Sequence, residues 1–265
     1  MLITVGSVKS GGVTTTALAL AAMWPSDARV LVVEADPAGG DVAAWFGLNR
    51  EPGLVSLSAD ARRDHTVETL FAHAQALPGG LPVVAAPASA EQAAGALGLL
   101  TGDGAPLWTA VAASDEVVVV VDAGRLDPGS PAHAVMTVSD VGLLVARPTL
   151  SDCHRLAGRL DGLTQRTKAA GTQLGLVLLG PGYSREQVEA SLQIPVLAHL
   201  PHDAKAAAHL SGAGGVRRIG TLALPKAAHA LGRDLAARAA PAAPDAVADA
   251  TGGSLQIPGE VSSAC

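Results

Sequence analysis

The amino-acid sequence predicts a doubly wound α/β fold, in which helices cover both faces of a mainly parallel sheet of about seven strands. Short runs rich in Val, Ile and Leu alternate with alanine-rich segments of helical length, which is the pattern of repeated strand-helix units. Of the 265 residues, 49% are hydrophobic and 16% are charged, which is enough apolar material for one sizeable core. We therefore expect one domain over residues 1–239.

Seven segments have the apolar, β-branched composition of buried strands. They are Leu2–Val5, Val30–Glu34, Pro82–Ala85, Glu116–Asp122, Val141–Ala146, Leu174–Leu179 and Val196–His199. Because such continuous apolar runs are typical of strands that are buried on both sides, they favour a parallel sheet.

Helices are expected between and after these strands, because the intervening segments are rich in alanine, the residue with the highest helix propensity. The expected helices are Thr15–Met23, Val67–Ala76, Ala90–Leu100, Pro131–Val138, Leu150–Thr167, Arg185–Leu192, Ala204–Leu210 and Leu222–Ala239. The last of them has an apolar stripe, which we expect to pack on the sheet. The stripe consists of Leu224, Ala228, Leu231 and Leu235.

Composition and charge exclude several classes of protein. The net charge of −6 and the aromatic content of 2% argue against a surface devoted to nucleic acid. Two cysteines, Cys153 and Cys265, cannot form a disulfide framework and fit a reducing compartment. Without a long apolar run or a signal peptide, the chain is expected to be cytoplasmic. Residues 240–265, rich in Ala, Pro, Gly and Ser, are expected to form a disordered tail.

The first expected strand leads into a loop rich in glycine and threonine, residues 6–16, and then into an alanine-leucine helix. Backbone N–H groups and the helix dipole at such a junction bind phosphate, and a threonine hydroxyl in the first helical turn can bind Mg²⁺. The alternative is a plain strand-to-helix turn, since short glycine patterns are common. Lys9 favours phosphate binding, because the chain has only three other lysines and 14 arginines.

The loop Lys9-Ser10-Gly11-Gly12-Val13-Thr14-Thr15-Thr16-Ala17 resembles the deviant Walker A motif K-G-G-x-G-K-[ST]-[ST] of the ParA/MinD family of ATPases. The resemblance implies a P-loop NTPase fold of the SIMIBI type that binds ATP and Mg²⁺. The implied ATP-binding residues in this loop are Lys9, Ser10, Gly11, Gly12, Val13, Thr14 and Thr15.

Matching the helix in register makes Lys9 the signature lysine, which in the family reaches across an ATP-sandwiched dimer, and makes Thr14 the Mg²⁺ ligand. Val13 then replaces the second family lysine, which cradles the β and γ phosphates. A gapless alignment places Thr14 at that position instead and moves the Mg²⁺ role to Thr15. Since the lost cation neutralises charge during phosphoryl transfer, hydrolysis should weaken more than nucleotide binding.

Two downstream segments continue the resemblance. The run Val30-Leu-Val-Val-Glu-Ala-Asp-Pro-Ala-Gly-Gly resembles the family's second strand and switch I, so Asp36 is implied to orient the attacking water and to lie at the metal. Glu34 replaces an upstream aspartate of that motif. Asp122, which follows a valine run, resembles the Walker B aspartate near the metal, with a turn or cap residue as the alternative.

The segment Pro195-Val-Leu-Ala-His-Leu-Pro-His-Asp is similar to the family's V-x-x-x-I-P-x-D loop near adenine, so Pro201 and Asp203 are adenine-side candidates. A zinc site at His199, His202, His209 and Asp203 is a weaker alternative, because His-x-x-His lacks a second compact ligand pair. The arginine pairs at 62–63 and 217–218 leave nonspecific DNA binding as a further, weakly supported partner.

The resemblance as a whole implies a nucleotide-dependent switch of bacterial spatial organisation, in partition, division-site placement or TadZ/CpaE-like pilus positioning, where altered Walker A lysines are frequent. We expect a homodimer in the nucleotide-bound state, an unidentified protein partner and slow ATP hydrolysis. The alternative is a pseudo-ATPase scaffold that dimerises without hydrolysis. Because the tail lacks a terminal amphipathic helix, autonomous membrane binding is not expected.

Overall fold

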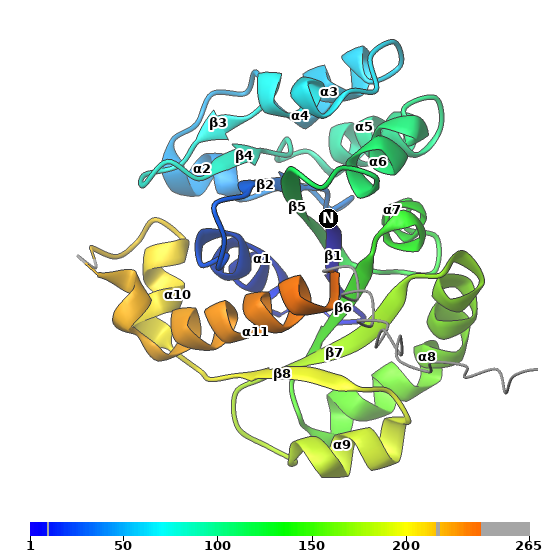
Figure 1. The fold of residues 1–265 in the computed structure, drawn as a ribbon, viewed down its shortest axis with the longest axis vertical. Helices are drawn as coiled ribbons and strands as arrows, with labels where there is room; N and C mark the ends of the chain where they lie inside the picture. The colour runs from blue at the N-terminus through cyan, green and yellow to red at the C-terminus, as the bar shows by residue number, and fades with distance from the viewer. Residues whose placement is uncertain (10, 216–217, 240–265) are drawn as a thin grey trace, which may run out of the picture.

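A computed structural model of the chain describes residues 1–9, 11–215 and 218–239. Its centre is an eight-stranded sheet in the order β3-β4-β2-β5-β1-β6-β7-β8 (Figure 1). Neighbouring strands are parallel, apart from the antiparallel pair β3 and β4. The strands are β1 (Leu2–Ser7), β2 (Arg29–Glu34), β3 (Gln75–Ala76), β4 (Pro82–Val84), β5 (Val117–Arg125), β6 (Val141–Ala146), β7 (Gln173–Leu179) and β8 (Val196–Leu200).

All seven expected strands are confirmed, and β3 is an additional one. The sequence placed Gln75 and Ala76 at the end of a helix, and this prediction is wrong, because the helix ends at Ala72. A turn through Gly79 and Gly80, with φ angles of 97° and 91°, reverses the chain and pairs β3 with β4. Positive φ angles of this kind are accessible to glycine at little cost, and they override the helical tendency of the preceding residues.

The eight expected helices form with ends that differ by a few residues, and three more were not expected. The unexpected helices are α2 (Val42–Phe46), α3 (Leu54–Asp60) and α6 (Ala105–Ala112). The expected ones are α1 (Val13–Ala22), α4 (Val67–Ala72), α5 (Ala90–Thr101), α7 (Ala132–Val138), α8 (Leu150–Ala170), α9 (Arg185–Leu192), α10 (Ala204–Leu210) and α11 (Ala223–Ala239). A 3-10 turn over Ile219–Thr221 precedes α11.

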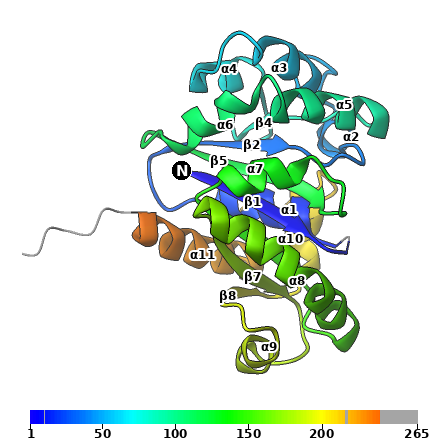
Figure 2. The same ribbon diagram turned by 90° about the vertical axis from the view of Figure 1, so that its right-hand side faces the viewer.

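Helices cover both faces of the sheet: in Figure 1, α1, α10 and α11 lie on one side of the strands and α5 to α8 on the other, and Figure 2 shows the face on which α7 and α8 lie in front of the strands. Along β5, Val119 and Val121 belong to one core, whereas Val118 and Val120 belong to the other. The first core is closed by α3 to α9, and the second by α1, α2, α10 and α11. The apolar stripe of α11 lies in the second core, as expected. This alternation is what two-sided burial of a parallel strand requires, and it confirms the doubly wound class.

Some expectations fall on residues outside the described ranges: the tail over residues 240–265 with Cys265, Ser10 in the loop, and Arg217. Within residues 1–9, 11–215 and 218–239, no helix combines the length and the hydrophobicity needed to cross a membrane.

We expect Gly158→Ala to raise the free energy of unfolding by about 0.5–1 kcal/mol, because glycine in an exposed helix interior costs this much relative to alanine. Gly158 lies within α8 and faces open space. Urea unfolding of the variant beside the unmodified protein measures the change. Gly175→Ala is the control, since its methyl group would overlap Leu197 in the core and should lower stability. A loss of stability in Gly158→Ala would contradict the expectation.

Candidate functional site

The loop between β1 and α1 has the backbone geometry of an anion-binding junction. Gly11 and Gly12 have φ angles of 157° and 79°, and a Cβ atom at Gly12 would overlap the side chain of Leu179. Within the described residues, no side chain caps the N-terminus of α1. The first backbone N–H groups of this helix are therefore left for an anion, and the helix dipole favours negative charge there.

A pocket of about 180 Å³ opens at this junction, at the carboxyl ends of β1 and β5. The residues that line it are Ser7, Gly11, Gly12, Val13, Thr14, Thr15, Asp36, Trp45, Gly124 and Arg125. Open α/β sheets bind ligands at the carboxyl ends of their strands, where neighbouring crossover connections leave a crevice. The position of the pocket therefore agrees with the position that the sequence predicts for a phosphate site.

Two buried polar atoms at this edge have no hydrogen-bond partner within the described residues: Ser7 Oγ and Asp122 Oδ2. Both residues are almost fully inaccessible to solvent. A buried polar atom without a partner costs about 1–3 kcal/mol, so native proteins rarely keep one unless something else satisfies it. These two atoms indicate that the edge is built to bind a polar ligand.

Asp122 is the most deeply buried carboxyl group of the site. It lies beside Val5 of β1 and Glu34 of β2 in the sheet register. Burial raises the pKa of Asp122 to about 6, while the Thr14 side chain and the Gly124 amide, at 3.0 Å from Oδ1, favour its ionised form. Thr14, the Mg²⁺ ligand implied by the alignment that keeps the helix in register, therefore lies beside Asp122.

Asp36 follows β2 and lines the pocket, whereas Asp122 is buried beside it and is not a lining residue. Its Oδ1 accepts a hydrogen bond of 2.8 Å from the Ala38 amide. Burial raises the pKa of Asp36, against the effect of the Ala38 and Arg125 amides. Gly124 packs directly on this carboxyl group at a φ of +53°, where a Cβ atom would overlap the Asp36 side chain. The loops after β2 and β5 are therefore in close contact at the pocket.

Neither of the two positions that match the Walker A lysines places a positive charge in the pocket. Val13 is only 5% exposed and its side chain belongs to the second core. Lys9 Nζ lies 3.4 Å from Asp152 Oδ1 of α8, and Lys9 does not line the pocket. The basic residue that does line it is Arg125, which the sequence did not single out.

Comparisons with known proteins identify the architecture. No protein-family model matches the sequence, and no curated protein matches it significantly. Among solved structures, a ParA family ATPase from Chlorobium tepidum TLS matches with a TM-score of 0.70 and 19% identity, over 88% of this chain and 98% of that one. The chain has the ParA/MinD fold.

Two further structures of this fold agree. The cell division ATPase MinD from Pyrococcus furiosus matches with a TM-score of 0.67 and 21% identity, over 90% of this chain and 99% of that one. The apo McdA structure from Cyanothece gives 0.65 and 17%, over 88% and 98%. The match therefore covers 98–99% of the length of each of these three neighbours.

Neither of the two adenine-side candidates, Pro201 and Asp203, lines the pocket at the loop between β1 and α1. Asp203 Oδ1 accepts a hydrogen bond from the Ala206 amide at 3.0 Å, and its Oδ2 accepts one from the Leu224 amide at 3.2 Å. These bonds, the one from Ala206 first, lower the pKa of Asp203. The carboxyl group thus caps α10 and joins it to the start of α11.

Two of the three histidines of the zinc alternative make separate contacts with the backbone. His199 Nε2 lies 2.6 Å from the Gly180 carbonyl oxygen, and His209 Nδ1 lies 2.9 Å from that of Gly214. In the part of the chain that the structure describes, no group of three or more His, Cys, Asp or Glu side chains is placed to hold a metal ion.

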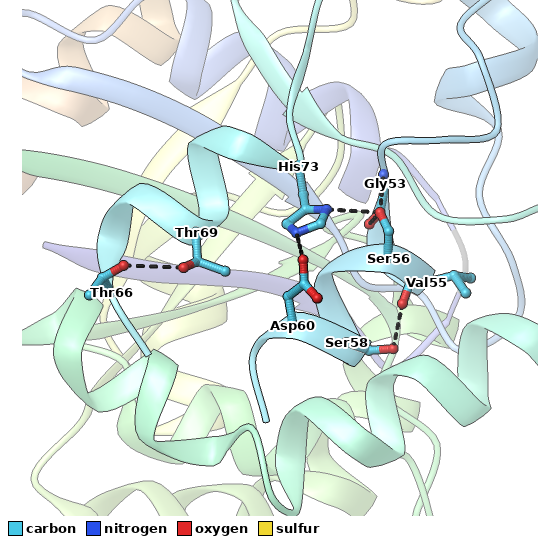
Figure 3. Close-up of polar contacts among 8 residues, drawn as sticks. All are labelled: Gly53, Val55, Ser56, Ser58, Asp60, Thr66, Thr69 and His73. Atoms are coloured by element: carbon cyan, nitrogen blue, oxygen red, sulfur yellow. Dashed lines mark hydrogen bonds and ion pairs between the residues drawn. The ribbon is translucent and has the colours of Figure 1, made fainter. Parts of the chain in front are cut away.

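A second polar cluster lies on α3 and at the end of α4 (Figure 3), and none of its residues lines the pocket. His73 Nδ1 lies 2.8 Å from Ser56 Oγ, and His73 Nε2 lies 3.0 Å from Asp60 Oδ2. Although this order of groups resembles a hydrolase triad, Ser56 Oγ also accepts from the Gly53 amide at 3.0 Å as the capping box of α3. The cluster therefore fastens α3 to α4.

Sequence reasoning missed several residues that line the pocket of this ParA/MinD fold. Ser7 ends the first strand, and Arg125 follows Asp122 by three positions, so their places next to recognised motifs are a usable signal. Trp45 comes from α2, a helix that the sequence did not predict, and no local pattern points to it.

Proposed function

We propose that this protein binds Mg-ATP in the pocket and acts as a nucleotide-dependent dimeric switch in bacterial spatial organisation, such as partition, division-site placement or pilus positioning. The observation that carries the proposal is the convergence, at one edge of the sheet, of a glycine-rich loop, an uncapped helix N-terminus and two buried polar atoms that have no partner among the described residues. Solved structures of this fold include an ATP complex of a McdA variant from Cyanothece and a Mg-ADP complex of MinD from Pyrococcus horikoshii, which supports the same ligand here.

The residues present fit the two parts of such a ligand. The Ser7 hydroxyl and the backbone N–H groups at the start of α1 are donors for phosphate oxygens. Magnesium in nucleotide sites is held by one or two carboxylates together with phosphate oxygens. Thr14, Asp36 and Asp122 would hold it, with Thr15 as the alternative to Thr14, and the contact between Thr14 and Asp122 favours Thr14. Bound Mg-ATP would supply the transferable phosphoryl group and the charge of the metal.

We further propose that hydrolysis is slow. Asp36 is placed at the pocket and can orient a water molecule, which supports turnover. Val13 lies in the apolar core and cannot neutralise phosphate charge, which supports the second candidate, a scaffold that binds ATP without hydrolysing it. The two candidates share the binding site and differ in the chemical step alone.

Calorimetric titration with Mg-ATP, run beside a steady-state phosphate-release assay, tests the proposal. We expect a clear heat of binding together with slow release of phosphate. Asp122→Asn should weaken Mg-ATP binding at least tenfold, since it removes a carboxylate from the metal side while preserving shape. Binding with background-level release would favour the scaffold, whereas no heat with Mg-ATP or Mg-ADP would overturn the proposed function.

The proposal includes a homodimer that forms with nucleotide and a protein partner that is not yet identified. The Lys9 side chain is 47% exposed and directed to α8 rather than into its own pocket, so it can reach a second copy. A complex of MinC with MinD from Aquifex aeolicus supports a protein partner for this fold. We expect light scattering to show a dimer with Mg-ATP and a monomer for Lys9→Ala. A monomer of the unmodified protein at saturating Mg-ATP would contradict the dimeric switch.

A further inference from the structure

We propose that Arg125 binds the terminal phosphates of the polyphosphate chain and so replaces the Walker A lysine that this sequence lacks. The inference rests on the proposed function, because it assigns a phosphate-binding residue to the same pocket. Its starting point is a mismatch between the expected ligand and the loop: the loop offers backbone donors and hydroxyl groups, but no cationic side chain that lines the pocket.

The register of β5 places Arg125 at the pocket. β5 continues past Asp122, and its Arg125 pairs with Ser7 at the end of β1. The Leu126 amide donates a hydrogen bond of 2.8 Å to the Ser7 carbonyl oxygen, which fixes this pairing. Arg125 is therefore adjacent to the buried Ser7 hydroxyl that has no partner within the described residues. Arg125 and the residue that carries this buried hydroxyl are thus neighbours in the sheet at the edge that faces the loop.

The charges around the pocket favour a cation at this position. Of the residues that line the pocket, Asp36 and Arg125 are the charged ones. A polyphosphate adds several negative charges beside Asp36 and the buried Asp122, so a compensating cation is needed for tight binding. A guanidinium group donates paired hydrogen bonds to phosphate oxygens and remains charged at all relevant pH values.

The present partner of Arg125 does not prevent this role. Arg125 Nε lies 2.9 Å from Asp127 Oδ1, and the two side chains are 52% and 56% exposed. Exposed ion pairs contribute little to stability, because water screens them and two long side chains must be ordered. Redirecting the guanidinium from Asp127 to a phosphate group therefore costs little.

The test compares Arg125→Gln, Arg125→Lys and Asp127→Asn with the unmodified protein in calorimetric titrations at one low ionic strength. Arg62→Gln is the matched control, because Arg62 is also a half-exposed arginine in a surface ion pair, with Asp103 at 3.3 Å, and does not line the pocket. The two probes are Mg-ATP and inorganic tripolyphosphate. Tripolyphosphate has no base, so it reports on the phosphate subsite alone.

We expect Arg125→Gln to weaken the binding of both probes at least tenfold, and Arg125→Lys to recover most of the loss. Asp127→Asn should bind both probes more tightly than the unmodified protein, because it releases the guanidinium. Arg62→Gln should stay within twofold. If Arg125→Gln unfolds in a thermal melt, Asp127→Asn decides the question: tighter binding of tripolyphosphate would support the role of Arg125, and unchanged binding would overturn it.

The outcomes separate this inference from the proposed function. Unchanged Mg-ATP binding in Arg125→Gln, with intact binding by the unmodified protein, would overturn the role of Arg125 and leave the function standing. Binding of tripolyphosphate that depends on Arg125, without any binding of Mg-ATP, would support the phosphate subsite and overturn the nucleotide function. Binding of neither probe by the unmodified protein would overturn both. Lys9→Gln is titrated in the same way, and a tenfold loss there with none in Arg125→Gln would assign the cation to Lys9 and overturn the inference.

Discussion

Gly124→Ala is expected to abolish Mg-ATP binding and to lower the free energy of unfolding by about 2–4 kcal/mol. Gly124 has a φ of +53°, which costs a residue with a Cβ atom about 1–2 kcal/mol. The new methyl group would also overlap the carboxyl group of Asp36, so either Asp36 or the segment after Asp122 must move. Asp36 and the segment after Asp122 both contribute to the pocket wall, so stability and binding should fall together.

Urea unfolding and calorimetric titration with Mg-ATP measure the two effects of Gly124→Ala. Gly129→Ala is the matched control, because Gly129 lies in the same segment, has no positive φ and faces open space. We expect this control to bind Mg-ATP normally and to unfold within about 0.5 kcal/mol of the unmodified protein. Normal binding by Gly124→Ala would mean that the contact between Gly124 and Asp36 does not shape the pocket.

Glu34→Gln is expected to remove about 3 kcal/mol of pH-dependent stability between pH 5 and pH 8. Glu34 is buried at the end of β2, and its carboxyl group accepts hydrogen bonds from three amides. They come from Asp41 at 2.8 Å, Val42 at 3.1 Å and Ala86 at 2.9 Å. Burial nevertheless prevails and raises the pKa of Glu34 from 4.5 to about 7.

A raised carboxyl pKa means that the folded protein binds this proton more tightly than the unfolded chain does. The stabilisation is complete below about pH 4.5 and is lost as the pH rises through 7. The unmodified protein should therefore gain stability relative to Glu34→Gln as the pH falls from 8 to 5. Comparing the two proteins at each pH cancels other groups, such as His133, whose pKa burial lowers.

Urea unfolding of both proteins across this pH range is the measurement. Asp122, with a pKa raised to about 6, remains in both proteins and should give Glu34→Gln a residual dependence of the same sign. A constant stability difference between the two proteins from pH 5 to pH 8 would show that Glu34 does not titrate in this window.

Much of the fold was predictable because its strands are specified locally. A run such as Val117–Val121 is apolar on both sides of the chain, and that pattern alone indicates a strand buried on both faces. The positive φ angles that create β3 were not predictable in this way, because Ala76 and its neighbours have good helix propensity. The short helices α2 and α3 follow turns, and nothing in their own composition marks them.

The same distinction holds for the candidate site, where some residues could be predicted from the local sequence and others could not. Thr14, Asp36 and Asp122 come from segments whose order along the chain is enough to place them at one sheet edge. Arg125 depends on the register between β5 and β1, which no local pattern reports. Whether the side chain of Val13 points to the pocket or to the core is also decided by packing, and the structure places it in the core.

The two-residue strand β3 has a consequence for how copies of this molecule can meet. Edge strands expose unpaired backbone groups that invite another chain to extend the sheet, and natural proteins shorten such edges to prevent aggregation. A border of Gln75 and Ala76 offers almost no template for an intermolecular strand. Association on that side must therefore rely on surfaces formed by helices and loops, so that self-assembly cannot propagate there as a continuous ribbon.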